Sequence, residues 1–161
     1  MSRINKAFFL MIGLLTGCIM AEQADSLEIP GKGAFQQVSF DTRTWEGDHS
    51  SLTLNADGKI ITNGKGHSGY GGEYGDGRHE YGPVPRKKVA RIVKLLSRPG
   101  SLVEKAQEAK NTSKSERITR TVVTADGSYD LIDLDPGGKL MLAAHGPVEQ
   151  AVIDLYEKYK R

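Results

Sequence analysis

Two tight-turn sequences, each flanked by alternating apolar and polar residues, most restrict how this chain can fold. Leu52 and Leu54 alternate with polar residues before the turn Asn55-Ala56-Asp57-Gly58, and Ile60 follows it. A second turn, Ala125-Asp126-Gly127-Ser128, is flanked in the same way. Alternation with a period of two is typical of half-buried strands, and glycine supplies the positive φ that such turns need. The strands predicted around the two turns are 51–55, 59–63, 117–125 and 129–134. The sequence therefore predicts two β-hairpins in an antiparallel sheet.

Two segments instead have the spacing of amphipathic helices. The first has an apolar stripe, begins near Pro85 and ends at Pro99-Gly100. The second begins at Gly146-Pro147. The stripes are Val89, Ile92, Val93 and Leu96, and Val148, Ala151, Val152, Leu155 and Tyr159. We therefore expect an α+β fold, with an antiparallel sheet of five or six strands and two main helices on one face.

Three further features concern the order of the elements. Strands are also expected at Phe35–Phe40 and Lys139–Ala143. The sequence Ser101-Leu102-Val103-Glu104 has the spacing of a capping box, which predicts a short helix or a solvated excursion. Each half of the chain has an Ala-Asp-Gly hairpin followed by a Gly-Pro-Val sequence before a helix, which suggests a duplicated strand–strand–strand–helix unit.

The N-terminus has the pattern of a secretory signal peptide. Arg3 and Lys6 precede an apolar run from Ala7 to Leu15, which is too short to span a bilayer comfortably. The run ends in Leu15-Thr16-Gly17-Cys18, which resembles the lipobox of bacterial lipoprotein precursors. The resemblance implies lipidation of Cys18, cleavage before it, and acyl chains that hold the protein at a membrane. The alternative is ordinary cleavage after Ala21, with loss of Cys18.

The resemblance also predicts the organisation and location of the protein. Residues 1–17 form the signal peptide, residues 18–33 the lipidated N-terminus and a flexible tether, and residues 34–161 a single domain. Ile19, rather than aspartate, follows the lipidated cysteine. This implies the outer membrane, facing the periplasm, as the location of the lipid anchor.

Charge and cysteine content exclude several classes of partner and site. Loss of Arg3 and Lys6 lowers the basic residues from 22 to 20, against 20 acidic residues. A neutral chain is not expected to bind nucleic acid. The only basic triplet, Arg86-Lys87-Lys88, is expected to be a solvated helix face. A single cysteine cannot form an internal disulfide or a cysteine-based zinc site.

The segment from Gly64 to Gly82 is rich in glycine and tyrosine, a composition typical of recognition loops. We therefore predict that it binds a partner protein, with Trp45 as a further contact. One alternative is a hairpin loop that leads into a strand and a helix, with its tyrosines packed on its own sheet. The other is that Trp45 belongs to the core. The candidate partner-binding residues are Trp45, His67, Tyr70, Tyr74, Arg78 and His79.

The sequence predicts neither catalysis nor a metal or cofactor. The histidines of the glycine-rich segment, His67 and His79, lack a familiar metal-ligand spacing. No nucleophile elbow surrounds Ser68. The spacing of Asp130, Asp133 and Asp135 departs from that of a calcium loop, so we expect aspartates on the exposed face of a strand.

The mature part of the chain resembles a family of secreted bacterial domains of unknown function. The resemblance covers about Val38 to Tyr159 and rests on Leu52–Lys59, the helix at Val89–Leu96, and Ile118–Asp133. Members of that family carry a Cys pair before the first hairpin, where this chain has none. Together these features predict a non-enzymatic envelope lipoprotein that binds proteins, as an inhibitor or immunity protein against an envelope-targeted toxin or hydrolase. The alternative is a structural or assembly lipoprotein of the envelope.

Overall fold

The computed structural model describes residues 27–43, 47–65, 74–105, 117–133 and 145–161. Within them an eight-stranded sheet carries two helices. The elements are β1 (Glu28–Ile29), β2 (Gly33–Arg43), β3 (His49–Asn55), β4 (Ile60–Lys65), β5 (Gly77–Tyr81), α2 (Arg86–Leu96), β6 (Leu102–Glu104), β7 (Arg117–Thr124), β8 (Gly127–Leu131) and α3 (Pro147–Tyr159). The predicted α+β architecture is confirmed, whereas the prediction of five or six strands is wrong.

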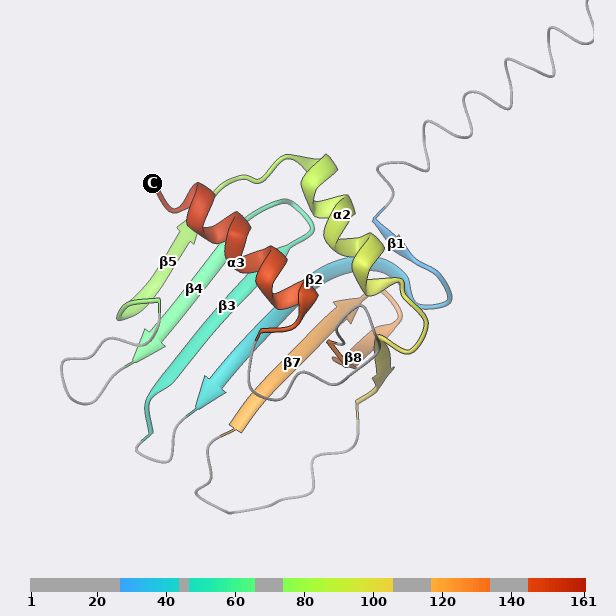
Figure 1. The fold of residues 1–161 in the computed structure, drawn as a ribbon, viewed down its shortest axis with the longest axis horizontal. Helices are drawn as coiled ribbons and strands as arrows, with labels where there is room; N and C mark the ends of the chain where they lie inside the picture. Colours follow the sequence, from blue (N-terminus) through green and yellow to red (C-terminus); the bar gives the residue numbers. More distant parts are fainter. Residues whose placement is uncertain (1–26, 44–46, 66–73, 106–116, 134–144) are drawn as a thin grey trace, which may run out of the picture.

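The sheet is antiparallel, with the strand order β5-β4-β3-β2-β7-β8-β6 and β1 paired to β2 (Figure 1). Its centre is the pair β2 and β7, in which Val38 lies opposite Val122. On the other side of β2, Val38 lies opposite Leu54, which faces Ile60 across the first hairpin. These apolar pairs therefore share one face of the sheet.

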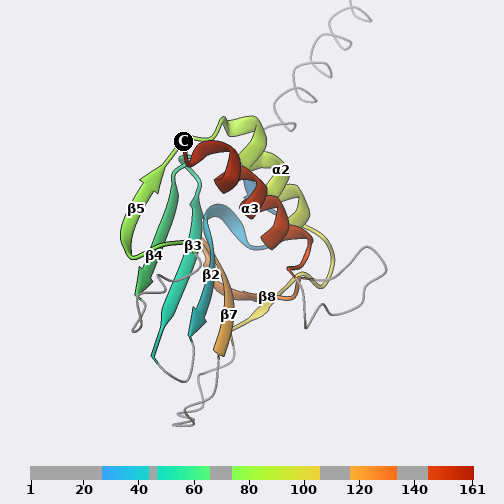
Figure 2. The same cartoon turned by 60° about the vertical axis from the view of Figure 1, so that its left-hand side comes forward.

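Both helices cover that face (Figure 2). Val89, Val93 and Leu96 of α2 and Val152 of α3 are fully buried against it, as the predicted stripes require. Each such side chain contributes about 1.5–3 kcal/mol when removed from water. The core therefore lies in one layer between the helix pair and the centre of the sheet.

The first hairpin turn also fixes the entry to α2. Gly58 has φ +85°, as predicted, and its carbonyl accepts a hydrogen bond of 2.8 Å from the Val84 amide. A Cβ on Gly58 would lie 2.3 Å from the Val84 carbonyl oxygen. Only glycine therefore allows the turn to lie directly against the segment that leads into α2.

A buried carboxylate fixes the start of α3. Asp133 is only 5% exposed, and its two carboxylate oxygens accept hydrogen bonds of 2.9 and 3.1 Å from the Val148 amide. It also accepts one of 2.9 Å from the Glu149 amide. The expectation of an exposed aspartate here is wrong, because Asp133 supplies the cap that Gly146, at the N-cap position, cannot provide.

Three strands lie where the sequence did not predict them. β6 occupies the predicted capping box, and Leu102 pairs with Leu131 of β8, so the prediction of a helix or solvated excursion there is wrong. β5 lies at the end of the glycine-rich segment, where only the alternative of a hairpin loop leading into a strand includes it, and it is exposed except at Tyr81, so it lacks the alternation typical of a strand. β1 lies within the predicted tether and pairs with Ala34 and Gly33 of β2. The predicted strand 139–143 lies outside the described residues.

The face of the sheet opposite the helices is polar. Ser39 of β2 lies between Thr53 of β3 and Thr121 of β7, and the Ser39 and Thr53 hydroxyls are 2.5 Å apart. Within the described part of the chain, no helix or strand covers this face, as the side view illustrates (Figure 2). Its polar character follows from the same alternation that places apolar residues on the other face.

Candidate functional site

The predicted partner-binding residues fall into two groups. Trp45, His67 and Tyr70 lie outside the described residues, as does Cys18, the predicted lipidation site. Tyr74, Arg78 and His79 belong to the end of the β4–β5 connection and to β5. β5 forms one edge of the sheet, so these three residues share a position at the side of the molecule (Figure 1).

Tyr74 packs the β4–β5 connection against α3. The centre of its ring lies 5.3 Å from that of Tyr156, and the centre of the Tyr81 ring lies 5.5 Å from that of Tyr156. Both pairs are edge-to-face. Tyr156 itself is 8% exposed. Burial and the neighbouring Tyr81 raise the pKa of Tyr156 above its ordinary value. Tyr74 and Tyr81 therefore pack the β4–β5 hairpin against α3. This agrees with the alternative that the tyrosines pack within the protein itself.

Arg78 and His79 lie on an exposed edge. The side chain of Arg78 is 60% exposed and forms an ion pair of 2.6 Å with Glu80, which is 47% exposed. The His79 Nε2 lies 2.9 Å from the Asp76 carbonyl oxygen. Among the described strands only β4 pairs with β5, so the outer backbone groups of β5 are available to a further strand. The charged side chains disfavour indiscriminate pairing at this edge.

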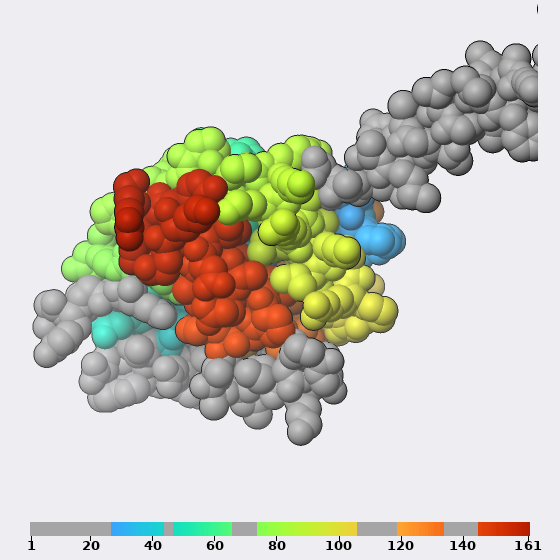
Figure 3. Space-filling model, turned by 45° about the horizontal axis from the view of Figure 1, so that its top comes forward, coloured from blue at the N-terminus to red at the C-terminus, as the bar shows by residue number. Residues whose placement is uncertain are grey.

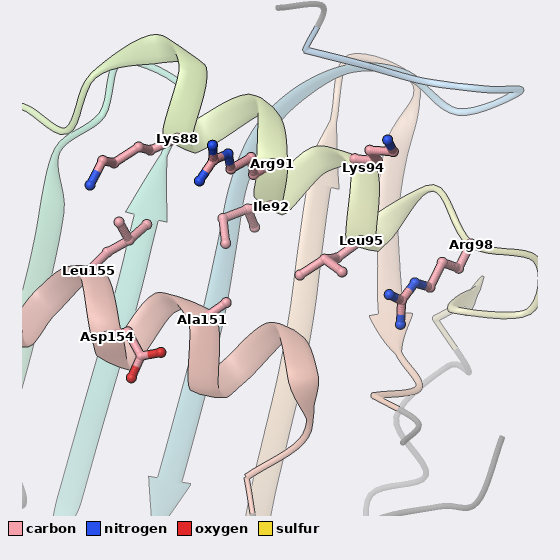
Figure 4. Close-up of a pocket in the computed structure, with 9 residues that line it drawn as sticks. All are labelled: Lys88, Arg91, Ile92, Lys94, Leu95, Arg98, Ala151, Asp154 and Leu155. Atoms are coloured by element: carbon pink, nitrogen blue, oxygen red, sulfur yellow. The ribbon is translucent and has the colours of Figure 1, made fainter. Parts of the chain in front are cut away.

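A groove of about 570 Å³ runs between the two helices (Figure 4). Ile92 and Leu95 of α2 and Ala151 and Leu155 of α3 form its apolar floor. The remaining lining residues are charged: Lys88, Arg91, Lys94, Arg98 and Asp154. Four of these five are cations, from α2 or from the residues just after it. Asp154 is the only charged residue that α3 contributes to the lining. The groove therefore combines an apolar floor with one strongly basic wall.

The positive side chains at the start of α2 lie at the positive end of the helix dipole. Its first residues are Arg86, Lys87 and Lys88, and its first turn contains no acidic residue. Cations at a helix N-terminus are disfavoured by the helix dipole, by about 0.3–1 kcal/mol each at an exposed site. The adjacent ammonium of Lys158, partial burial and Arg91 all lower the pKa of Lys88. The cations of the helix layer are therefore crowded together, in a position that does not favour the helix.

This basic surface is not among the sites predicted from the sequence, although the sequence contains its signal. Between Arg86 and Arg98 the chain contains six Lys or Arg residues and no Asp or Glu. The chain as a whole has 22 basic and 20 acidic residues, so its near neutrality does not indicate this local excess. From the sequence, only the triplet Arg86-Lys87-Lys88 is singled out, and it is predicted to be a solvated face. The fold adds Lys158 of α3 to the same surface, which the sequence alone could not show.

Other charged contacts lie between neighbouring elements of the fold. Glu149 of α3 accepts a hydrogen bond of 3.0 Å from the Arg120 Nε of β7 and lies 3.1 Å from the His145 Nδ1. His49 of β3 lies 3.2 Å from Asp41 of β2, on the polar face of the sheet. Within the described ranges no group of three or more His, Cys, Asp or Glu residues could hold a metal ion. No helix in those same ranges has the length and apolar character needed to cross a membrane.

Comparisons of the chain with protein-family models, curated proteins and solved structures gave no match. The resemblances to lipoprotein precursors and to secreted bacterial domains therefore stay predictions from the sequence.

Proposed function

We propose that the chain is an envelope lipoprotein whose domain binds another protein, with Cys18 as its lipid anchor. The proposed location is the outer membrane, with the domain in the periplasm. The specific role that we propose is that of an inhibitor or immunity protein directed at an envelope-targeted toxin or hydrolase. The proposal includes no catalytic step and no cofactor.

The observation that carries the protein-binding proposal is the exposed edge strand β5. Its residues from Gly77 to Glu80 are exposed, and its outer backbone groups pair with none of the described strands. An extended segment of a partner could add to this edge by main-chain hydrogen bonds, while Arg78, His79 and Glu80 select the sequence. Because Tyr74 and Tyr81 fasten the strand to Tyr156, the edge is held in place before binding.

Capture of proteins from an envelope extract tests the binding proposal. The chain from residue 18 onward is immobilised, and bound proteins are identified for the unchanged chain and for the double variant Arg78→Glu/His79→Ala. The matched control is Arg43→Glu/His49→Ala, which changes the same residue types on β2 and β3. We expect the β5 variant to lose a toxin or hydrolase that the control retains. Equal recovery of every protein by both variants would refute the role of β5.

The identity of the captured material separates the two functions considered from the sequence. Stoichiometric recovery of one secreted hydrolase or toxin, together with loss of its activity, supports inhibition. Recovery of bulk peptidoglycan or abundant outer-membrane proteins supports a structural or assembly role instead. Mass spectrometry of the native protein tests the lipid anchor separately. We expect acyl chains on Cys18, and an unmodified N-terminal peptide that begins at Glu22 contradicts the anchor.

We also propose that the two halves of the domain derive from one duplicated unit. Support comes from the sheet centre, where β2 and β7 pair antiparallel and each is followed by its own hairpin partner, β3 or β8. Each half then ends in a helix on the same face (Figure 1). The duplication requires a third strand near residues 139–143, which amide hydrogen exchange of that segment would test.

A further inference from the structure

The helix layer presents a basic surface on one side of the molecule. Figure 3 shows α2 and α3 side by side on this face. We define the basic helix face as Arg86, Lys87, Lys88, Arg91, Lys94 and Arg98 of the α2 region together with Lys158 of α3. Among the described residues, none of the α2-region cations forms an ion pair with a carboxylate. The face therefore carries positive charge that no carboxylate of the described residues pairs with directly.

Stability of the fold does not account for this charge. The apolar side of α2 is already buried against the sheet through Val89, Ile92 and Val93. Arg86, Lys87 and Lys88 oppose the helix dipole, and Lys88 lies beside the like charge of Lys158. Neutral or acidic residues in the first turn would favour the helix more. A disfavoured cluster of exposed cations is the pattern expected of a surface that binds an anionic partner.

The shape of the surface identifies the kind of anionic partner. The cations flank an apolar floor formed by Ile92, Leu95, Ala151 and Leu155, as Figure 4 shows. A soluble anion or a nucleic acid backbone gains nothing from an apolar floor. An amphiphile that joins anionic groups to hydrocarbon matches both parts of the groove.

The position of the chain's N-terminal side favours a membrane as that amphiphile. The described chain begins at Leu27, and Ile29 of β1 is buried in the same core as α2, with which β1 is in contact. Leu27 follows Cys18 by nine positions, which a fully extended chain spans in about 30 Å. A lipid anchor at Cys18 would thus hold α2 within a short distance of the bilayer. Stable membrane attachment commonly combines a lipid chain with a basic surface of this kind.

We propose that the basic helix face docks the domain onto a bilayer surface rich in anionic lipid headgroups. This inference rests on the proposed lipid anchor for the choice of a membrane as the amphiphile and for the orientation of the domain. The charge of the face and the composition of the groove are independent of the anchor. Docking in this orientation would place the two helices against the membrane and leave the edge strand β5 at the side of the domain, accessible to a partner.

Vesicle binding by unlipidated protein tests the inference. The described elements lie between residues 27 and 161 and share one hydrophobic core, so a chain of residues 18–161 with Cys18→Ser retains the domain. Its sedimentation with vesicles of phosphatidylglycerol and phosphatidylethanolamine is compared with that on pure phosphatidylcholine. We expect binding only to the anionic vesicles, and weaker binding as salt is raised.

Matched double variants assign the binding to the basic helix face. Each basic residue near an anionic surface strengthens binding about fivefold, so Arg91→Gln/Lys94→Gln should weaken it about 25-fold. The control Arg43→Gln/Lys65→Gln removes the same two residue types from the far end of β2 and β4, and should weaken binding less than about twofold. Circular dichroism verifies that both variants are folded. The exposed positions of these side chains make loss of folding unexpected.

Three results would overturn the inference. These are absence of binding to the anionic vesicles, equal weakening by both double variants, and binding to polyglutamate but not to vesicles. The last result would assign the face to an acidic protein instead of a membrane. Because the assay uses the Cys18→Ser chain, failure of the lipid anchor cannot cause any of them. Conversely, a native protein without acyl chains would refute the anchor while vesicle binding through α2 still stood.

Discussion

Replacement of Asp133 by alanine should destabilise the domain by about 3 kcal/mol. Its carboxylate accepts the Val148 and Glu149 amides at 2.9 to 3.1 Å, and the side chain is almost fully buried. Each buried amide left without a partner costs about 1–3 kcal/mol, and loss of an N-cap alone costs about 0.5–2 kcal/mol. Water that enters the space left by the carboxylate can hydrogen-bond to the two amides and offset part of this cost. We therefore expect a loss of about 3 kcal/mol, which is less than the two amide costs and the cap loss added together.

Equilibrium unfolding in urea, followed by circular dichroism, measures this change. Asp133→Asn keeps an acceptor oxygen but loses the negative charge at the helix N-terminus, so we expect a loss of about 1–2 kcal/mol. Asp130→Ala is the control, since Asp130 is a half-buried aspartate in the neighbouring β8. Amide hydrogen exchange should also become faster at Val148 and Glu149 in Asp133→Ala. A loss within about 0.5 kcal/mol of the control, with unchanged exchange at both amides, would show that the cap does not hold α3.

Further predictions concern the first hairpin turn, the tyrosine cluster and a buried hydroxyl. Gly58→Ala should destabilise the domain by clearly more than the 1–2 kcal/mol expected for Gly100→Ala. Both glycines have positive φ, but only a Cβ at position 58 meets backbone atoms within 3 Å, so equal unfolding free energies would contradict the close approach to Val84. The pKa of Tyr156 is raised above 10.0, so the unfolded chain releases this proton first and stability should fall as pH rises above about 10. Tyr156→Phe should reduce that fall in alkaline unfolding curves, and Tyr159→Phe, as the control, should not. The Thr62 hydroxyl is buried without a hydrogen-bond partner among the described residues. Thr62→Val should therefore raise the unfolding free energy by about 1 kcal/mol. An unfolding free energy of Thr62→Val below that of the unchanged protein would show that the hydroxyl does have a hydrogen-bond partner.

The two surfaces proposed here differ in how far the sequence could predict them. The glycine-rich segment is conspicuous in composition, and the sequence predicts Arg78 and His79 as partner contacts. The structure places both on the edge strand β5. Tyr74 was predicted for the same role, but its ring packs on Tyr156, which lies more than eighty residues later in the chain. Composition indicates that a tyrosine is suited to contact. It does not indicate whether the contact is with a partner or with the protein's own helix.

The groove between α2 and α3 was not predictable in the same way. The run of cations from Arg86 to Arg98 is visible in the sequence, and an analysis of local charge would have found it. The apolar floor requires Ala151 and Leu155 of α3 to lie beside Ile92 and Leu95 of α2. These residues are neighbours only because both helices cover the same face of the sheet. Amphipathic periodicity shows which side of each helix is buried, but not which face of the sheet it covers.

The sequence by itself determined the local elements of this protein. Alternation around the turns at Gly58 and Gly127 specified the two hairpins, and apolar stripes specified α2 and α3. These signals are local, because apolar residues on one face repeat about every 3.6 residues in a helix and every 2 residues in a strand. Only the tertiary structure decided that Asp133 caps α3, that Leu102 joins β8 as a strand, and that β5 forms an edge. Each of these depends on partners distant in the chain, where pairing and burial override local propensity.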